Sequence, residues 1–155
     1  MKKCFPKKSV LFVCTHNSVR SQMAEALLNK IYGDRYSAFS VGSDPTQIDP
    51  LVVSVMREIG IDVSNYHSKG LNILKDCNPE YVVTVCDQAK ESCPYFPGGN
   101  LHLHRCFSDP SKFQGWHEDV IKEYRRTRDE IKNWIEKEFG RYLNFSANIY
   151  CETPS

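Results

Sequence analysis

The chain has 155 residues, of which 41% are hydrophobic and 25% are charged, and its net charge at pH 7 is +1. This length fits a single domain with a core of ordinary size, and the composition is typical of globular proteins. The nearly balanced charge excludes a strongly basic protein, so we expect no nucleic-acid partner.

Four lysines among the first eight residues precede an apolar run at residues 10–13. That run is far too short for the apolar part of a signal peptide or for a membrane span. We therefore expect a solvated N-terminal arm, no membrane association and a location in the cytoplasm.

Strand and helix patterns then alternate along the chain. Short apolar runs predict strands at 9–13, 36–41, 81–86 and 101–106. Apolar residues at helical spacing predict helices at 21–32, 50–59, 68–76 and 116–139. Gly33, Gly60 and Gly140 mark helix ends, and the apolar stripe of the last helix, beginning at Trp116, is expected to be core. Prolines and glycines at 94–99 predict an irregular, mobile loop.

This alternation predicts an α/β domain with a parallel sheet and helices on both faces. We expect one domain over residues 1–140 and a tail without predicted structure over 141–155. Parallel sheets bind ligands beyond the carboxyl ends of their strands. Because Cys14 ends the first predicted strand and Cys86 the third, we expect both cysteines at this edge.

The seven cysteines have no repeated spacing, and without an export signal they favour reduced thiols over a disulfide framework. Zinc sites need close cysteine pairs, and the nearest pair here is Cys86 and Cys93. We therefore expect no metal site and no cofactor. Cys77 and Cys106 are expected to be buried or half-buried.

A cysteine and an arginine, Cys14 and Arg20, bracket the turn between the first strand and the first helix. A helix N-terminus aims backbone N–H groups at one point, and Arg20 adds a planar fork of donors that fits phosphate or arsenate. The same positive field favours the thiolate, which is the nucleophilic form of cysteine. The pattern therefore predicts a nucleophile in an oxyanion site rather than a buried cysteine beside a surface arginine.

The residues of this turn are candidate oxyanion ligands: Thr15, His16, Asn17, Ser18, Val19, Arg20 and Ser21. The hydroxyls of Ser18 and Ser21 can donate to the sulfur of Cys14. Asn17 can brace the loop, although Asn17 and Ser18 are also ordinary turn residues. We expect His16 to face solvent rather than to donate to the site.

Displacement of an oxygen also needs an acid, and Asp109 after the fourth predicted strand is the candidate. The following Pro110 restricts this aspartate to extended geometry, which can project its carboxyl over the site. Asp-Pro also opens turns, so the position alone leaves both roles open.

Taken together, these motifs resemble the thioredoxin-coupled arsenate reductases, which have the low-molecular-weight protein tyrosine phosphatase fold. The resemblance spans residues 10–139 and rests on VCTHNSVRSQMAE (13–25), VTVC (83–86), CP (93–94) and SDP (108–110). Phosphatases of this fold share the first and last motifs but have no need of Cys86 and Cys93. They also usually place a proline soon after the serine at position 21. These differences favour a reductase.

The resemblance implies a three-layer fold around a four-stranded parallel sheet in the order 2-1-3-4. It implies that Cys14 attacks arsenate held by Arg20 and the loop amides, while Asp109 protonates the departing oxygen. Cys86 then attacks Cys14 and releases arsenite, Cys93 attacks Cys86, and thioredoxin reduces the resulting disulfide. Related reductases use glutaredoxin or mycothiol, so the expected partner is thioredoxin or another thiol reductant, acting on a monomer.

The resemblance also bears on cation binding. Some relatives hold potassium near the loop with residues equivalent to Asn17, Glu25 and Ser40 and with a further carboxylate. Lys69 stands at the position of that carboxylate here, and its ammonium can take the place of the cation. We therefore expect no potassium site.

Two other functions stay open at this point. A phosphotyrosine phosphatase would use Cys14, Arg20 and Asp109 through a cysteinyl phosphate. A redox-sensing or oxyanion-binding regulator would instead let Cys86 and Cys93 toggle without turnover.

Overall fold

The computed structural model describes residues 7–74, 76–87 and 96–144, with side chains to residue 140. Its strands are β1 (Lys8–Cys14), β2 (Tyr36–Gly42), β3 (Tyr81–Thr84) and β4 (Leu101–His104). Its helices are α1 (Arg20–Tyr32), α2 (Pro50–Arg57) and α3 (His117–Asn144), with short 3-10 helices η1 (Leu71–Leu74) and η2 (Pro110–Lys112). None of the helices in these ranges is both long and apolar enough to cross a membrane.

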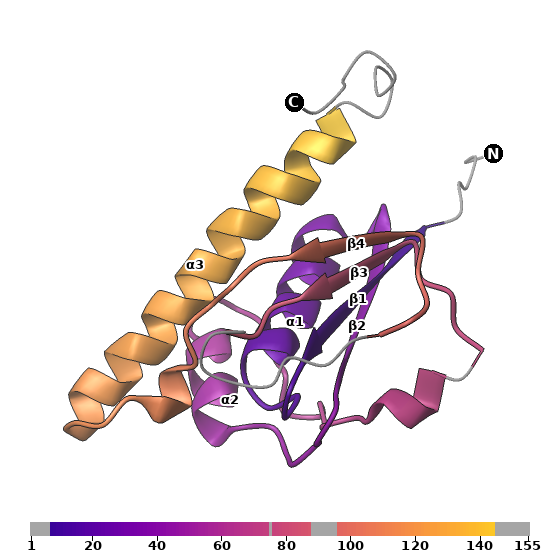
Figure 1. Ribbon diagram of the computed structural model, residues 1–155. Coiled ribbons are helices and arrows are strands. Elements are labelled where there is room, and N and C mark those ends of the chain that lie inside the picture. Colours follow the sequence, from indigo (N-terminus) through magenta and orange to yellow (C-terminus); the bar gives the residue numbers. More distant parts are fainter. Residues whose placement is uncertain (1–6, 75, 88–95, 145–155) are drawn as a thin grey trace.

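The four strands form one parallel sheet in the order β2-β1-β3-β4 (Figure 1). In its register Val13 pairs with both Val41 and Thr84, and Cys14 pairs with Gly42. The apolar run of β1 lies at the centre of the sheet and is fully buried, as continuous apolar strands of parallel sheets are. The predicted α/β class and strand order are confirmed. Helices were predicted on both faces of the sheet, but among the described elements only the short 3-10 helix η1 packs on the second face.

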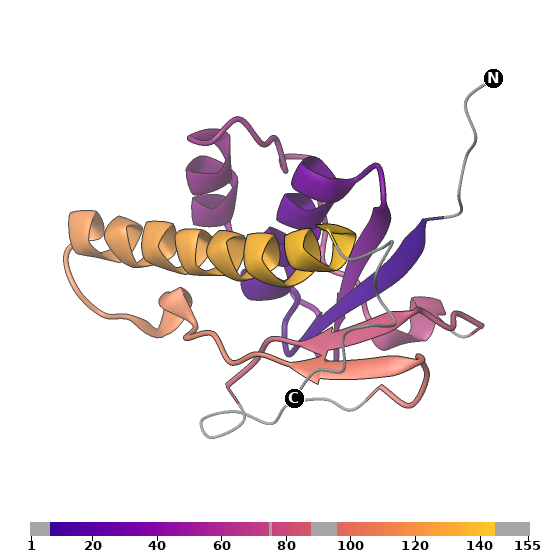
Figure 2. The same cartoon turned by 90° about the horizontal axis from the view of Figure 1, so that it is seen from above.

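Two apolar clusters cover the two faces of the sheet. The larger one joins Phe12 and Val83 to residues of α1, α2 and α3, which lie together on one side of the sheet (Figure 2). The smaller one joins Leu11 and Val13 of β1 to Leu74 of η1 and to Phe96. Since adjacent residues of β1 point to opposite faces, this one strand supplies both clusters.

Helix α3 closes the larger cluster with Tyr124, Ile131, Ile135 and Phe139, all buried. The ring of Phe139 lies edge-on to those of its aromatic neighbours, with centroids 5.0 to 6.5 Å apart. The predicted core stripe is therefore confirmed for this part of the helix. It is wrong for Trp116, which precedes the helix and is 83% exposed.

Several element ends differ from the sequence prediction. Gly140 lies inside α3 rather than at its end, and a Cβ there would overlap the hydroxyl of Tyr32 on α1. The glycine therefore leaves room for the end of the Tyr32 side chain and does not terminate the helix. The helix predicted at 68–76 is only the 3-10 turn η1, and β3 and β4 end two residues before the predicted cysteines.

The end of β2 abuts the turn that carries the predicted oxyanion ligands. A Cβ added at Gly42 would lie 2.5 Å from the carbonyl oxygen of Thr15 and 2.8 Å from the backbone nitrogen of Asn17. The backbone N–H of Gly42 meanwhile donates to the carbonyl of Lys69 at 2.8 Å. Only glycine lets β2 and the turn approach this closely.

We expect Gly42→Ala to lower the free energy of unfolding by about 1–3 kcal/mol, because the methyl group meets backbone atoms that cannot rotate away. It should also weaken phosphate binding, since the turn has to move. Urea unfolding and calorimetric titration with phosphate measure both effects. Gly70→Ala is the matched control, because its added Cβ meets mainly the rotatable side chain of Asn72. Equal losses in the two variants would refute this role of Gly42.

Candidate active site

A cavity of about 200 Å³ opens where β1 ends and α1 begins. It is lined by Cys14, His16, Ser18, Val19, Arg20, Thr46, Asp109 and Ser111. The cavity thus joins the turn after β1 to the connection that follows β2 and to the segment that follows β4. Its place at the carboxyl edge of the sheet is where parallel sheets bind ligands.

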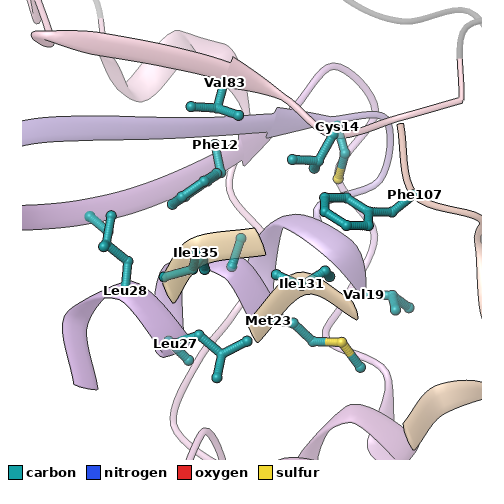
Figure 3. Packing of buried hydrophobic residues seen from close by; sticks show 14 of the residues in the cluster. Phe12, Cys14, Val19, Met23, Leu27, Leu28, Val83, Phe107, Ile131 and Ile135 are labelled. Carbon is teal, nitrogen blue, oxygen red and sulfur yellow. The ribbon is translucent and has the colours of Figure 1, made fainter. Parts of the chain in front are cut away.

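The sulfur of Cys14 lies among hydrogen-bond donors at the edge of the apolar cluster, beside Phe107 (Figure 3). The backbone N–H of Asn17 donates to it at 3.2 Å, and the hydroxyl oxygen of Ser21 lies 2.8 Å away. Because Ser21 already accepts from the side-chain amide of Asn17 at 2.7 Å, its own hydrogen is available to the sulfur. Ser18 lines the cavity but makes no hydrogen bond to this sulfur. The sulfur of Cys14 thus has one backbone and one side-chain hydrogen-bond donor beside it.

Asn17 fixes the shape of the turn. Its φ of 51° lies in the left-handed region, which asparagine tolerates better than most residues. Its side-chain amide also donates to Ser40 at 2.9 Å, and its side-chain oxygen accepts from the backbone of Lys69 at 2.8 Å and from Gln22 at 3.0 Å. Asn17 is itself fully buried. It therefore ties the turn to α1, to β2 and to the segment before η1.

Arg20 and Asp109 lie next to each other in the lining of the cavity. The guanidinium of Arg20 is 3% exposed; it donates to the carbonyl of Phe107 at 3.3 Å and lies 3.4 Å from a carboxylate oxygen of Asp109. The other carboxylate oxygen of Asp109 accepts from the backbone and the hydroxyl of Ser111, at 3.0 and 2.6 Å. Asp109 therefore opens the turn η2 and also presents its carboxyl to the cavity, so the two roles left open by the sequence coexist.

A second link to the turn runs through Asp49, which was not among the residues predicted from the sequence. Its backbone N–H donates to the carbonyl of Ser18 at 3.2 Å, and its side chain caps α2 through Leu51. Tyr124 of α3 donates its hydroxyl to the same carboxylate at 2.6 Å, and burial together with this carboxylate raises the pKa of Tyr124. The signal that could have found it is an aspartate directly before Pro50 at a helix start. Thr46 and Ser111 carry no such local signal.

The side chain of Lys69 forms an ion pair with the carboxylate of Glu25. Its ammonium nitrogen is 3.5 Å from Glu25 Oε1, which also accepts from the hydroxyl of Ser40 at 2.6 Å. The ammonium also donates to the carbonyl of His67 at 3.1 Å. Among the described residues, no group of three or more His, Cys, Asp or Glu side chains could hold a metal ion.

The other described cysteines differ in redox state and in burial. Cys86 lies two residues beyond β3, is fully buried and belongs to the same apolar cluster as Cys14. It is disulfide-bonded, whereas Cys14, Cys77 and Cys106 are free. The predicted relay residue Cys93 lies outside the described residues. Cys77 and Cys106 are exposed, so their predicted burial is wrong: one follows the surface turn η1 and the other follows the edge strand β4.

We expect Ser21→Ala to slow alkylation of Cys14 by iodoacetamide at neutral pH by about tenfold, because a hydrogen bond to the thiolate is lost. The rate is measured by mass spectrometry of the peptide that contains Cys14. Ser18→Ala is the control, since Ser18 lines the same cavity without contacting the sulfur. If both variants react at the rate of the parent protein, Ser21 does not stabilise the thiolate.

We expect the parent protein to melt at the same temperature in equal concentrations of potassium and sodium chloride, because the Lys69 ammonium already neutralises Glu25. Lys69→Asp should introduce a higher melting temperature in potassium, since carboxylate, amide and hydroxyl oxygens would then surround the position of the ammonium. Lys69→Met removes the charge without adding an oxygen and should stay insensitive to the choice of cation. A potassium effect on the parent protein would contradict this account.

Residues 9–144 match the family of low molecular weight phosphotyrosine protein phosphatases. An arsenate reductase of Halalkalibacterium halodurans is 39% identical over 125 residues, which is 81% of this chain and 90% of that protein. The crystal structure of an arsenate reductase from Archaeoglobus fulgidus matches with a TM-score of 0.71 and 28% identity, over 84% of this chain and 98% of that one. A thioredoxin-dependent arsenate reductase of Corynebacterium glutamicum matches with a TM-score of 0.57 and 29% identity, over 86% of this chain and 64% of that one. The chain belongs to the low molecular weight phosphotyrosine protein phosphatase family, and these relatives are arsenate reductases.

Proposed function

We propose that this protein reduces arsenate to arsenite through a relay of three cysteine thiols. The observation that carries the proposal is the placement of Cys14 and Cys86 just beyond paired positions of two neighbouring strands. Val13 pairs with Thr84, and the backbone N–H of Val85 donates to the carbonyl of Val13 at 3.0 Å. Both cysteines are buried in one cluster. A phosphatase reaction needs Cys14 but does not use the thiol of Cys86.

In the first step the thiolate of Cys14 attacks the arsenic atom of arsenate. A sulfur–arsenic bond forms and an arsenic–oxygen bond breaks, and Asp109 supplies the proton with which that oxygen leaves as water. The guanidinium of Arg20 and the backbone N–H groups of residues 15–20 hold the remaining oxygens. The hydrogen bonds from Ser111 fix the orientation of the Asp109 carboxyl.

In the second step Cys86 attacks the sulfur of Cys14. The disulfide forms, the sulfur–arsenic bond breaks, and its electron pair stays on arsenic, which leaves as arsenite. Cys93 then attacks Cys86, and Cys14 departs as a thiolate that Asn17 and Ser21 stabilise. The end of this sequence requires a disulfide at Cys86 and a free Cys14, which is the combination found in the structure. In the proposed relay Cys93 is the partner of Cys86 in the final disulfide.

The reductant that returns the disulfide to two thiols is proposed to be thioredoxin, the reductant named for the C. glutamicum relative, or another thiol protein. The free thiols of Cys14, Cys77 and Cys106 suit a reducing compartment, so we place the reaction in the cytoplasm. This chain itself supplies the nucleophile, the arginine and the acid of the proposed reaction, so we propose that it acts as a monomer.

A second candidate function is phosphate-ester hydrolysis through a cysteinyl phosphate. The observation in its favour is that Cys14, Arg20 and Asp109 line one cavity in a chain of the phosphatase family. Since arsenate and phosphate esters present similar tetrahedral oxygens, we expect weak aryl-phosphatase activity beside the reductase activity.

The test compares Cys86→Ser and Cys93→Ser in two assays, arsenate-dependent oxidation of thioredoxin and hydrolysis of an aryl phosphate. Both variants should lose arsenate reduction and keep hydrolysis, because each removes a relay thiol and neither alters the cavity. Cys14→Ser should lose both activities, and Cys77→Ser, which changes an exposed thiol, should lose neither. Dominant hydrolysis in the parent, unchanged in both relay variants, would establish a phosphatase. A parent protein without either activity would point to a regulator.

A single arsenate turnover without reductant, followed by thiol trapping and disulfide mapping, locates the final disulfide. The relay predicts the pair Cys86–Cys93. Accumulation of a Cys14–Cys86 disulfide would show that Cys93 takes no part.

A further inference from the structure

We propose that His16 determines specificity for protonated oxyanions: the Nε2 atom of its neutral ring accepts a hydrogen bond from an O–H group of the bound anion. The inference deepens the proposed function, on which it rests, because it assumes that the oxyanion occupies the cavity beside Cys14 and Arg20. It reverses the expectation from the sequence that His16 only faces solvent.

The backbone holds His16 at the cavity. Its carbonyl oxygen accepts from the N–H of Thr46 at 3.2 Å, and the carbonyl of the preceding Thr15 accepts from the N–H of Asp44 at 2.8 Å. The turn is thereby fastened to the connection between β2 and α2. The side chain of His16 is 41% exposed and forms part of the cavity lining. The ring therefore reaches both solvent and a bound anion.

A contact with Asp44 decides which ring nitrogen carries the proton. Nδ1 of His16 lies 3.0 Å from the backbone carbonyl oxygen of Asp44. A carbonyl oxygen only accepts hydrogen bonds, so Nδ1 is the donor and carries the hydrogen. In a neutral imidazole the other nitrogen, Nε2, then has a lone pair. Within the described part of the chain no protein group is hydrogen-bonded to Nε2, which leaves it for a ligand.

A ring nitrogen that accepts and cannot donate differs from the other groups of the cavity. The hydroxyl groups of Ser18, Thr46 and Ser111 can donate as well as accept, so they suit protonated and unprotonated anions alike. Arg20 and the backbone N–H groups of the turn can only donate, and Asp109 has to hold a proton in order to act as the acid. Arsenate and phosphate carry at least one proton at neutral pH, and their O–H groups need acceptors. Sulfate carries none and accepts at every oxygen. A lone pair on Nε2 therefore favours arsenate and phosphate and is repelled by sulfate.

Protonation of the ring would reverse this preference, because Nε2–H then donates to any oxygen. The charged groups that face His16 come from several elements. The carboxylate of Asp44 lies 3.7 Å from Nδ1, and Cys14, Asp109 and Arg20 of α1 line the same cavity as His16. Discrimination between phosphate and sulfate should accordingly be largest in mildly alkaline solution and decrease on acidification.

The test measures the affinities for phosphate and for sulfate by calorimetry at about pH 8 and about pH 5.5, on either side of the ordinary histidine range. The full-length chain with Cys14→Ser is used, so that titration of the thiol does not contribute. Protonation of phosphate itself affects every variant equally, so the phosphate-to-sulfate affinity ratio is compared between variants at the same pH. His117→Asn is the control, because this exposed histidine at the start of α3 does not line the cavity.

We expect His16→Gly to lower the phosphate-to-sulfate ratio at about pH 8 by about tenfold, the effect of one hydrogen bond to a charged ligand. His16→Lys, which can only donate, should lower the ratio further and remove the contribution of position 16 to its pH dependence. His117→Asn should behave as the parent does. A ratio unchanged in both His16 variants, with phosphate binding retained, would overturn the proposal.

The outcomes separate this inference from the proposed function. If the His16 variants keep the phosphate-to-sulfate affinity ratio of the parent and the parent reduces arsenate, only the role of His16 is refuted. If the parent does not reduce arsenate but the His16 variants lower the phosphate-to-sulfate affinity ratio, the reductase is refuted and His16 remains a specificity residue of an oxyanion site.

Discussion

The side chain of Asn17 is the constraint on which the rest of the site depends. The turn between β1 and α1 has to keep its N–H groups converging on one point, and it cannot use them in secondary structure. Asn17 adopts a left-handed backbone conformation there and gives all of its side-chain hydrogen-bonding capacity to Ser21, Ser40, Gln22 and the backbone of Lys69. A single buried amide thus replaces the regular backbone hydrogen bonds that this turn lacks.

Around this amide the fold adds supports from segments far apart in the sequence. Gly42 lets β2 contact the turn closely, Asp49 binds it from the start of α2, and Tyr124 extends that link to α3. Lys69 balances the charge of Glu25 with a covalently attached ammonium. A diffusible cation would have to be bound from solution, whereas this charge is present whenever the chain is folded.

The same cavity can serve two chemistries, and the difference lies outside it. In the proposed mechanism Cys14, Arg20 and Asp109 act as nucleophile, anion clamp and acid, and these roles suit a phosphate ester as well as arsenate. Arsenate can be reduced because arsenic accepts an electron pair when a second thiol attacks the first. In the proposed relay Cys86 is that thiol, and the parallel pairing of β1 and β3 brings it to the edge of the sheet at which Cys14 lies.

The sequence by itself determined the sheet, the principal helices and the placement of Cys14 and Arg20 at the two ends of one turn. These features depend on apolar periodicity and on short spacings, which are local properties of the chain. Only the tertiary structure showed that Thr46 and Ser111 line the cavity, that Asp44 sets the tautomer of His16, and that Gly140 serves packing. Each of these follows from a contact between segments distant in sequence, and no local pattern records such a contact. The exposure of Trp116, Cys77 and Cys106 has the same cause, because residue type predicts a tendency to be buried while only the packed fold decides which positions are covered.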